Sequence, residues 1–191
     1  MISRELRELL TAWVVLSLCF SIRAVLLPAF FILMFAVALV TVGLGFVFHE
    51  LAHKYVARIF GCWAEFRLWM WGLVVALLFS ILSMGRIIFA APGAVLIIPY
   101  TYSISSRKAG LIALAGPAAN IILATLFLLL TGAGGFLRFI AMYGSRVNLW
   151  LATFNMIPFG QADGLKVFSW NKLAWATITI PLCTVVFLPI I

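Results

Sequence analysis

The chain has 191 residues, of which 66% are hydrophobic and 9% are charged, and its formal net charge is +8. About a quarter of the residues in a soluble domain are charged, so this composition excludes an ordinary soluble protein. The lysines and arginines stand singly between apolar runs and form no basic patch with interleaved aromatic residues, which argues against nucleic acid as a partner. The sequence therefore predicts an integral membrane protein in contact with the lipid bilayer.

The first apolar runs are of unequal length. Residues 9–22 form a run of 14 residues, which can span a bilayer only if flanking side chains snorkel or the bilayer thins. Residues 24–48 form an uncharged run of 25 residues, long enough to span alone. We expect this helix to continue through His53, because nothing breaks it before Gly61. The lysine and arginines that follow predict that this end faces the cytoplasm.

Residues 68–106 are harder to assign. An uncharged stretch over 68–85 is followed by Arg86 and by a segment rich in β-branched residues around Pro92-Gly93. We expect a β-hairpin there, packed on protein or lining a cavity, since bare strands cannot face lipid. Residues 85–97, "GRIIFAAPGAVLI", are the candidate edge strand. Two short helices, out and back, are the alternative.

The second half of the chain contains a clear span over 109–132, in which Gly116-Pro117 indicates close helix packing. Residues 147–162 are expected to return across the membrane, and 173–191 form the last run. The predicted fold is thus an all-α polytopic membrane protein with about five to six transmembrane helices and a small membrane-associated β-hairpin element. We see no repeat or linker, so residues 1–191 are taken as a single membrane-embedded domain.

Both histidines of the chain lie in "HELAH", residues 49–53. On a helix, His49 and His53 share one face with their Cβ atoms about 5–6 Å apart, a spacing at which two imidazoles can bind one zinc ion. Glu50 lies beside them and can act as a base on a zinc-activated water. The alternative is a pair of interfacial histidines at a helix end, with Glu50 paired to Lys54.

A catalytic zinc site usually has three protein ligands and one open position. Asp163 is the only aspartate in the chain and follows an apolar run in a Pro- and Gly-rich break. An unpaired aspartate at a membrane face is costly, whereas a metal ion would satisfy it. Glu65 is the rival ligand, although it is more simply a partner of Arg67 or Arg58.

"HELAH" together with "NMIPFGQADG", residues 155–164, resembles the site-2 protease family of intramembrane zinc metalloproteases. The resemblance covers roughly residues 24–170. It implies that His49, His53 and Asp163 bind one zinc ion per chain and that Glu50 is the catalytic base. It also matches Asn155 and Pro158 to the second motif. The chain departs from the family at Ala162, Gly160 and Gln161, which affects loop shape and substrate gating.

The central span of that family is similar to the one that begins "LAGPAAN" here, and Asn120 matches a polar position in it. Asn155 and Asn120 are candidate oxyanion or substrate residues, because a neutral amide donor costs less to bury than a charge. Hydrogen bonding between helices is the equal alternative for both. The β element after the motif is expected to present an extended substrate.

The function expected is that of an intramembrane zinc metalloendopeptidase, which cleaves transmembrane segments of substrate proteins on the cytoplasmic side of a prokaryotic cell membrane. Three alternatives stay open: a zinc-binding membrane carrier or channel, a catalytically inactive relative that binds membrane proteins, and a membrane protease with a glutamate ligand, such as a prenyl-protein protease. The sequence leaves the oligomeric state and the substrate open.

Overall fold

The computed structural model describes residues 3–88 and 92–188. Helices dominate it, and two strands form one small antiparallel sheet. In chain order the elements are α1 (Arg4–Ser21), η1 (Ile22–Ala24), α2 (Pro28–Ile59), β1 (Cys62–Leu68), α3 (Met70–Leu82), β2 (Gly93–Pro99), α4 (Ser106–Leu129), η2 (Leu130–Gly132), α5 (Gly135–Asn155), α6 (Asp163–Trp170) and α7 (Lys172–Phe187).

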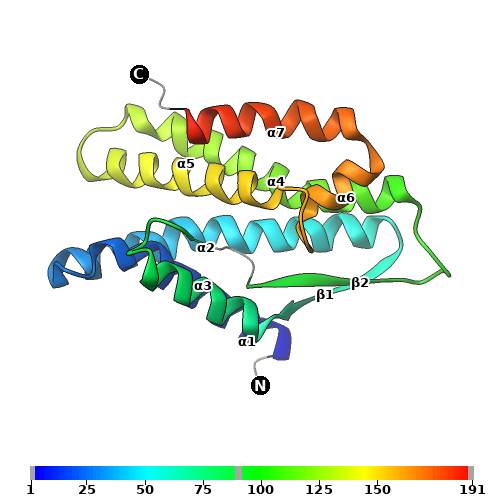
Figure 1. Cartoon of the computed structure of the whole chain (residues 1–191), viewed down its shortest axis with the longest axis horizontal. Coiled ribbons are helices and arrows are strands. Elements are labelled where there is room, and N and C mark those ends of the chain that lie inside the picture. Colours follow the sequence, from blue (N-terminus) through cyan, green and yellow to red (C-terminus); the bar gives the residue numbers. More distant parts are fainter. Residues whose placement is uncertain (1–2, 89–91, 189–191) are drawn as a thin grey trace.

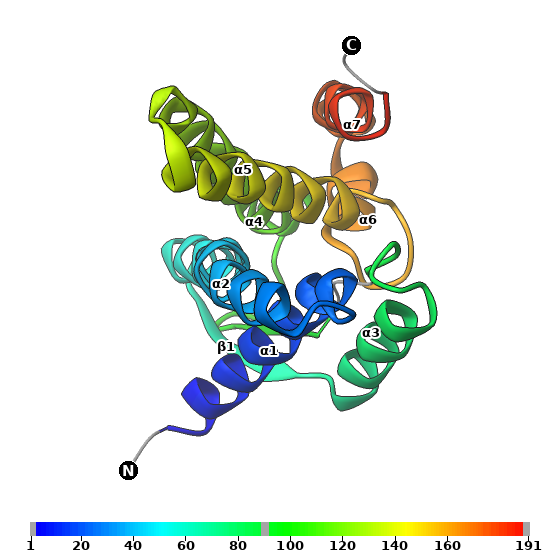
Figure 2. The ribbon, with the colours of Figure 1, turned by 90° about the vertical axis from the view of Figure 1, so that its left-hand side faces the viewer.

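The long helix α2 runs through the middle of the molecule. Figure 1 shows α4, α5 and α7 on one side of it, and α1, α3 and the sheet on the other. The end-on view in Figure 2 shows the same division, with α7 set apart from α2. The largest buried cluster joins α1, α2, β1 and α5. A second cluster joins α4, α5, α6 and α7.

The ends of α2 follow from its sequence. Pro28 occupies its first turn, where the missing N–H costs nothing and the fixed φ suits a helix. An uncharged run then continues without a break, as predicted. The helix ends before Gly61, whose φ of +75° is a conformation that glycine adopts at little cost. The chain reverses there and enters β1.

The predicted count of transmembrane helices is wrong. In the part of the chain that the structure describes, only Pro28–Ile59 and Ser106–Gly132 are long and apolar enough to cross a membrane. Counting apolar runs overestimated the number because several runs do not form long apolar helices. The run at 9–22 belongs to α1, which also carries four charged residues, and the run at 147–162 belongs partly to α5, which also carries two arginines. Residues 70–82 and 172–187 form helices of 13 and 16 residues.

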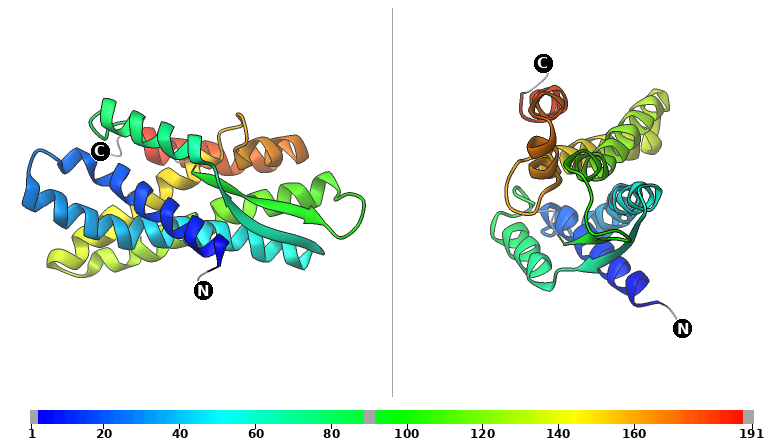
Figure 3. Two further views of the ribbon diagram at one scale, coloured as in Figure 1. Left: turned by 90° about the horizontal axis from the view of Figure 1, so that it is seen from below. Right: turned by 90° about the vertical axis from the view of Figure 1, so that its right-hand side faces the viewer.

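The predicted hairpin around Pro92-Gly93 is also wrong. Gly93 begins a strand, and β2 pairs with β1, with Trp63 opposite Ile98 and Arg67 opposite Ala94. Helix α3 lies between the two strands in sequence, so they are not joined by a tight turn (Figure 3). Part of the candidate edge strand, residues 89–91, lies outside the described residues. Of the described remainder, residues 93–97 are strand as predicted, whereas residues 85–88 are not strand.

Candidate metal centre

His49 and His53 lie on one face of α2, one helical turn apart. Their Nε2 atoms are 3.0 Å from each other, and the ring centroids are 4.6 Å apart with the planes nearly perpendicular. Both residues are buried, with 5% and 6% of their surface exposed. The spacing in the sequence therefore gives the predicted pair of imidazoles, with both Nε2 atoms directed to the same point.

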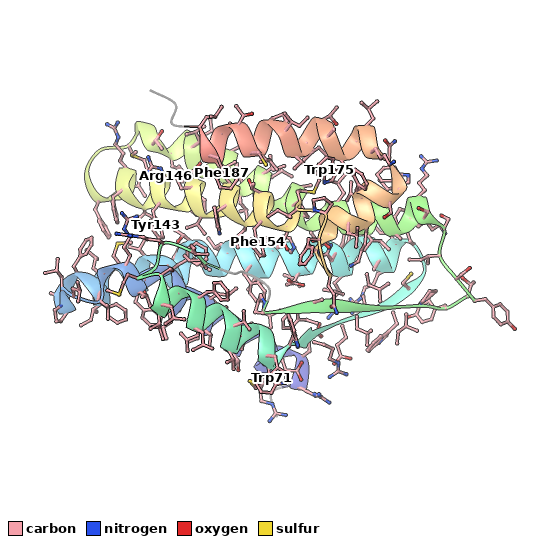
Figure 4. The ribbon with its side chains drawn as sticks, in the orientation of Figure 1. Trp71, Tyr143, Arg146, Phe154, Trp175 and Phe187 are labelled. Carbon is pink, nitrogen blue, oxygen red and sulfur yellow. The ribbon has the colours of Figure 1, made fainter. Side chains whose placement is uncertain are left out.

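Asp163 reaches the same point from the other half of the molecule. It is the first residue of α6, and its Oδ2 lies 3.0 Å from His53 Nε2 and 3.3 Å from His49 Nε2. Gly164 must follow it, because a Cβ there would meet the backbone of Met156. Trp175, labelled in Figure 4, donates from its indole N–H to the Met156 carbonyl at 2.8 Å and so fixes the turn before α6.

Helix α4 presents a stripe of three residues to these histidines. Ile112, Gly116 and Asn120 are spaced by four residues and therefore share a face. A Cβ at Gly116 would meet the Nε2 atoms of both histidines, so only glycine leaves space beside them. The predicted close packing at Gly116-Pro117 thus occurs at the cluster itself.

The other ring nitrogens of the histidines contact oxygen atoms that can only accept hydrogen bonds. His53 Nδ1 lies 2.7 Å from the Ile112 carbonyl, and His49 Nδ1 lies 2.6 Å from Asn120 Oδ1. The orientation of the Asn120 amide is fixed, because its Nδ2 donates to the Gly45 carbonyl at 2.9 Å and to Asn148 Oδ1 at 3.0 Å. Both Nδ1 atoms therefore carry hydrogen, and in the neutral rings both Nε2 atoms present lone pairs.

Three acceptors consequently converge with no hydrogen between them: two imidazole nitrogens and one carboxylate oxygen. All of these ligand atoms lie within 4.8 Å of one another. Such an arrangement requires a cation at its centre. Two histidines and one carboxylate, with an oxygen acceptor for the Nδ1–H group of each histidine, are a donor set of catalytic zinc. The residues therefore fit zinc.

A proton is the other cation that can take this place. Burial alone raises the pKa of Asp163, but a protonated imidazole beside it outweighs burial, so that pKa lies well below its usual range. The Asp163 carboxylate is therefore negatively charged under ordinary conditions, as a metal ligand must be.

Glu50 lies on the next position of α2 and is 7% exposed. Among the described residues its Oε2 atom is buried and has no hydrogen-bond partner. It does not pair with Lys54, because the Lys54 ammonium contacts both carboxylate oxygens of Glu5 at 2.6 Å. A buried carboxylate oxygen without a partner costs free energy, and such groups are typical of sites that act on a ligand.

The comparisons with known proteins address the chemistry of this cluster. No family profile and no solved structure matches the chain significantly. A curated protein of Methanocaldococcus jannaschii, named "Putative zinc metalloprotease MJ0611", is 40% identical over 182 residues, which cover 94% of this chain and 91% of that protein. The chain belongs to this zinc metalloprotease family. The predicted chemistry is thus confirmed at that level, while membership of the site-2 proteases stays a prediction.

The structure places the remaining predicted residues outside the ligand cluster. Both amide hydrogens of Asn120 are already donated, so its contacts support the interhelical role and leave no donor for an oxyanion. Asn155 is half-buried, and its Nδ2 donates to the Leu151 carbonyl in its own helix at 2.9 Å. Glu65 lies on β1 and contacts Arg67 at 3.1 Å, as the simpler interpretation predicted.

Asn148 is a residue that sequence reasoning missed. It is fully buried on α5, accepts from Asn120, and donates from its own Nδ2 to the Gly144 carbonyl at 2.9 Å. It therefore sets the orientation of the amide that sets the tautomer of His49. The signal was present in the sequence, because Asn148 precedes Asn155 of the second motif by seven residues and therefore shares a helix face with it.

Proposed function

We propose that the chain is an intramembrane zinc metalloendopeptidase similar to the site-2 proteases. It holds one zinc ion at His49, His53 and Asp163 and cleaves apolar membrane segments of other proteins. The observation that carries this proposal is the convergence of three ligand atoms beside the partnerless Glu50, on a helix that is long and apolar enough to cross a bilayer.

The position of the cluster along α2 supports cleavage within or at the edge of the membrane. Residues 28–48 are uncharged and extend for about 30 Å as a helix, which is the thickness of the hydrocarbon core. His49 follows directly. Large apolar side chains on the outer faces of α2 and α4 are exposed, as lipid contact requires. They include Ile32, Val40, Phe48, Ile122 and Leu128.

The charges after the cluster support a cytoplasmic orientation. Lys54 and Arg58 follow His53 within two turns, and Arg107 and Lys108 begin the first turn of α4. Because α4 runs back along α2, with Ile112 opposite His53 and Asn120 opposite His49, these cations lie at the same end of the helix pair. An excess of lysine and arginine is typical of the cytoplasmic side.

The residues of the cluster have separate roles in hydrolysis. Zinc, when bound, supplies Lewis-acid activation of a water and of the substrate carbonyl. Glu50 accepts the proton of that water through its free Oε2 and returns it to the leaving amine. Asn120 and the Ile112 carbonyl hold the histidine rings in the tautomer that presents both Nε2 lone pairs. The intact Glu50 favours a protease over an inactive relative.

The substrate is proposed to bind in an extended form along β2. A helical peptide bond is shielded by its own backbone hydrogen bonds, so a membrane helix must unwind before it is cut. Adding the unwound segment to a sheet edge replaces the hydrogen bonds that it loses. β2 lies near the end of α2 that carries the metal cluster, since the side chains of Val95 and Ile97 pack against a buried apolar cluster that includes Ala57 of that helix.

The proposal is tested by mapping the scissile bond in a single-span model substrate in bicelles. We expect zinc-dependent cleavage inside or at the edge of its apolar segment. Glu50→Gln is the inactive control, which excludes a contaminating protease. Cleavage that falls only in the soluble flanks of the substrate would contradict intramembrane proteolysis while leaving a zinc protease.

The strand role of β2 is tested by Val95→Pro against Val95→Ala. Both lose the packing of the valine side chain, but only proline removes the backbone N–H. We expect Val95→Pro to lose substrate cleavage much more than Val95→Ala does, with zinc content equal in both variants. Equal losses of cleavage would show that Val95 acts only through packing.

A further inference from the structure

The two edges of the sheet differ in their free backbone groups. In an antiparallel pair, successive residues alternately face the partner strand and face away from it. Trp69 N–H donates to the Pro92 carbonyl and Tyr100 N–H donates to the Gly61 carbonyl, just beyond either end of the ladder. The backbone N–H and C=O groups of odd-numbered β1 residues therefore point to β2, and those of even-numbered β1 residues point outward. In β2 the backbone groups of the odd-numbered residues point outward.

Helix α1 occupies the outer edge of β1. Phe66 N–H donates to Glu5 Oε1 at 3.0 Å, and Leu68 N–H donates to Glu8 Oε2 at 3.0 Å. Residues three apart on a helix lie on one face, and residues two apart on a strand lie on one edge, so the two pairs match. Two carboxylates thus take the places that the carbonyls of a neighbouring strand would take.

Both carboxylates are held in place by cations. Lys54 contacts the two oxygens of Glu5 at 2.6 Å, and Arg4 Nε contacts Glu8 Oε1 at 2.7 Å. Lys54 follows His53 directly on α2. The closed edge of β1 is therefore tied to the helix that carries the metal cluster.

The outer edge of β2 is open. Within residues 3–88 and 92–188, no described group accepts from the outward N–H of Val95 or Ile97. Charged side chains on an edge commonly prevent pairing with another chain, and β2 has none.

We propose that Glu5 and Glu8 determine where the substrate binds, by closing the edge of β1 so that an extended substrate can pair only with β2. This inference rests on the strand addition of the proposed function. Glu5 and Glu8 are positioning residues, since they touch neither the substrate nor the cluster. The occupant of the open edge is the extended peptide whose bond is to be cut.

The closed edge is tested first by amide hydrogen exchange, read residue by residue. Replacing both glutamates by alanine removes the acceptors, so exchange at Phe66 and Leu68 should rise by about tenfold or more. The Glu5→Gln, Glu8→Gln pair keeps an acceptor oxygen and should retain most of the protection. Glu65→Gln is the control, because that carboxylate contacts Arg67 and no strand N–H. Unchanged protection in the alanine pair would overturn the inference.

The choice of edge is tested by photocrosslinking to a bound transmembrane substrate in the Glu50→Gln background, which prevents cleavage. A photoreactive residue replaces either Leu96 on β2 or Trp63 on β1, both exposed in the structure. With Glu5 and Glu8 intact, we expect substrate crosslinks from Leu96 and none from Trp63. In the alanine pair, we expect crosslinks from both positions. If the alanine pair unfolds at a much lower temperature than the parent, the single variants Glu5→Ala and Glu8→Ala are used in its place. Each of them removes one of the two acceptors at the edge of β1.

The outcomes separate the two proposals. Substrate crosslinks from Leu96 that persist while Trp63 stays silent in every variant would overturn the role of Glu5 and Glu8 but leave strand addition intact. Crosslinks from Trp63 in the parent would do the same. Absence of crosslinks from Leu96 throughout would overturn strand addition itself. Crosslinks between two enzyme chains at Leu96 would show that a second copy occupies the open edge.

Discussion

The acidic side chains of the chain divide into two regions with opposite surroundings. Glu5, Glu8 and Glu65 lie on α1 and β1, where each contacts a lysine, an arginine or a strand N–H. Glu50 and Asp163 are buried. Glu50 Oε2 has no hydrogen-bond partner among the described residues, whereas Asp163 Oδ2 lies 3.0 and 3.3 Å from two imidazole nitrogens and Asp163 Oδ1 lies 3.9 Å from the Lys166 ammonium. The chain has five acidic residues, and the three in the first region all have hydrogen-bonding or charged partners within the protein. The second region leaves one Glu50 oxygen without a partner and brings together three ligand atoms that could hold a metal ion.

The largest effect is expected from Glu50→Gln. The amide has nearly the same shape but cannot accept a proton, so peptide cleavage should fall by about 10²–10⁴-fold or more. Zinc content should be unchanged, because Glu50 is not in the ligand cluster. Cleavage assays and metal analysis on the same preparation check this. Loss of zinc together with cleavage would move Glu50 from the catalytic role to a ligand or structural role.

Gly116→Ala tests whether the buried region depends on the space beside the histidines. Its Cβ would meet the Nε2 atoms of both histidines, so we expect zinc affinity to fall by about 100-fold or more. This is the upper end of the losses seen when a group that contacts a metal ligand is mutated. Gly132→Ala is the matched control on the same helical segment, since a Cβ there meets nothing within 4 Å. Competition with a chelator measures both variants. Equal affinities would show that α4 can shift away from the cluster.

Asn148→Leu tests the outer hydrogen bonds of His49. The leucine leaves one Asn120 N–H without an acceptor and frees that amide to turn, which should lower zinc affinity by about 10–100-fold. Asn120→Leu should act in the same way, and the double variant should be no worse than the stronger single, because the two amides act in series. Additive losses would mean that Asn148 acts on the fold rather than on His49.

The smallest effect belongs to the other region and depends on pH. Partial burial raises the pKa of Glu5 and Glu8, but Lys54, Arg4 and the strand N–H groups outweigh it and hold each pKa below the ordinary value of 4.5. Their contribution to stability is therefore present above about pH 4.5 and is lost as the pH falls through the lowered values. We expect about 1 kcal/mol or less in total.

Thermal unfolding of the parent and of the Glu5→Gln, Glu8→Gln pair between about pH 6 and pH 3 measures this contribution. The two curves should differ at the upper end and converge at the lower end. A constant difference across the range would show that the carboxylates are not charged partners of Lys54 and Arg4.

Local patterns in the sequence predicted much of the site. The spacing of His49 and His53 needs only a helix, and the uncharged run over 24–48, with no helix breaker before Gly61, predicts one. Asp163 was found because the chain offers few ligands. Long-range pairing was not predictable in the same way. Apolar and polar residues alternate in "AEFRL", residues 64–68, which is a strand pattern, but the stretch is short and its partner follows only after a helix.

The contacts of Glu5 and Glu8 were equally hidden, because their partners lie about sixty residues away and are backbone groups that every residue possesses. The number of spans was overestimated for a related reason. Apolar runs of 14 to 18 residues suit a buried helix or a strand as well as a short span, and only packing decides between them. The sequence thus defines chemistry at single residues better than it defines the extent of elements.

Zinc binding to purified protein, measured for the parent, Asp163→Ala and Glu65→Ala, tests the division between the two regions most directly. We expect one zinc ion per chain in the parent and in Glu65→Ala. In Asp163→Ala we expect a zinc affinity at least about 100-fold weaker, since a ligand is lost and not merely a group that contacts a ligand. Zinc that is retained by Asp163→Ala and lost by Glu65→Ala would show that Asp163 is not the third ligand and that Glu65 is.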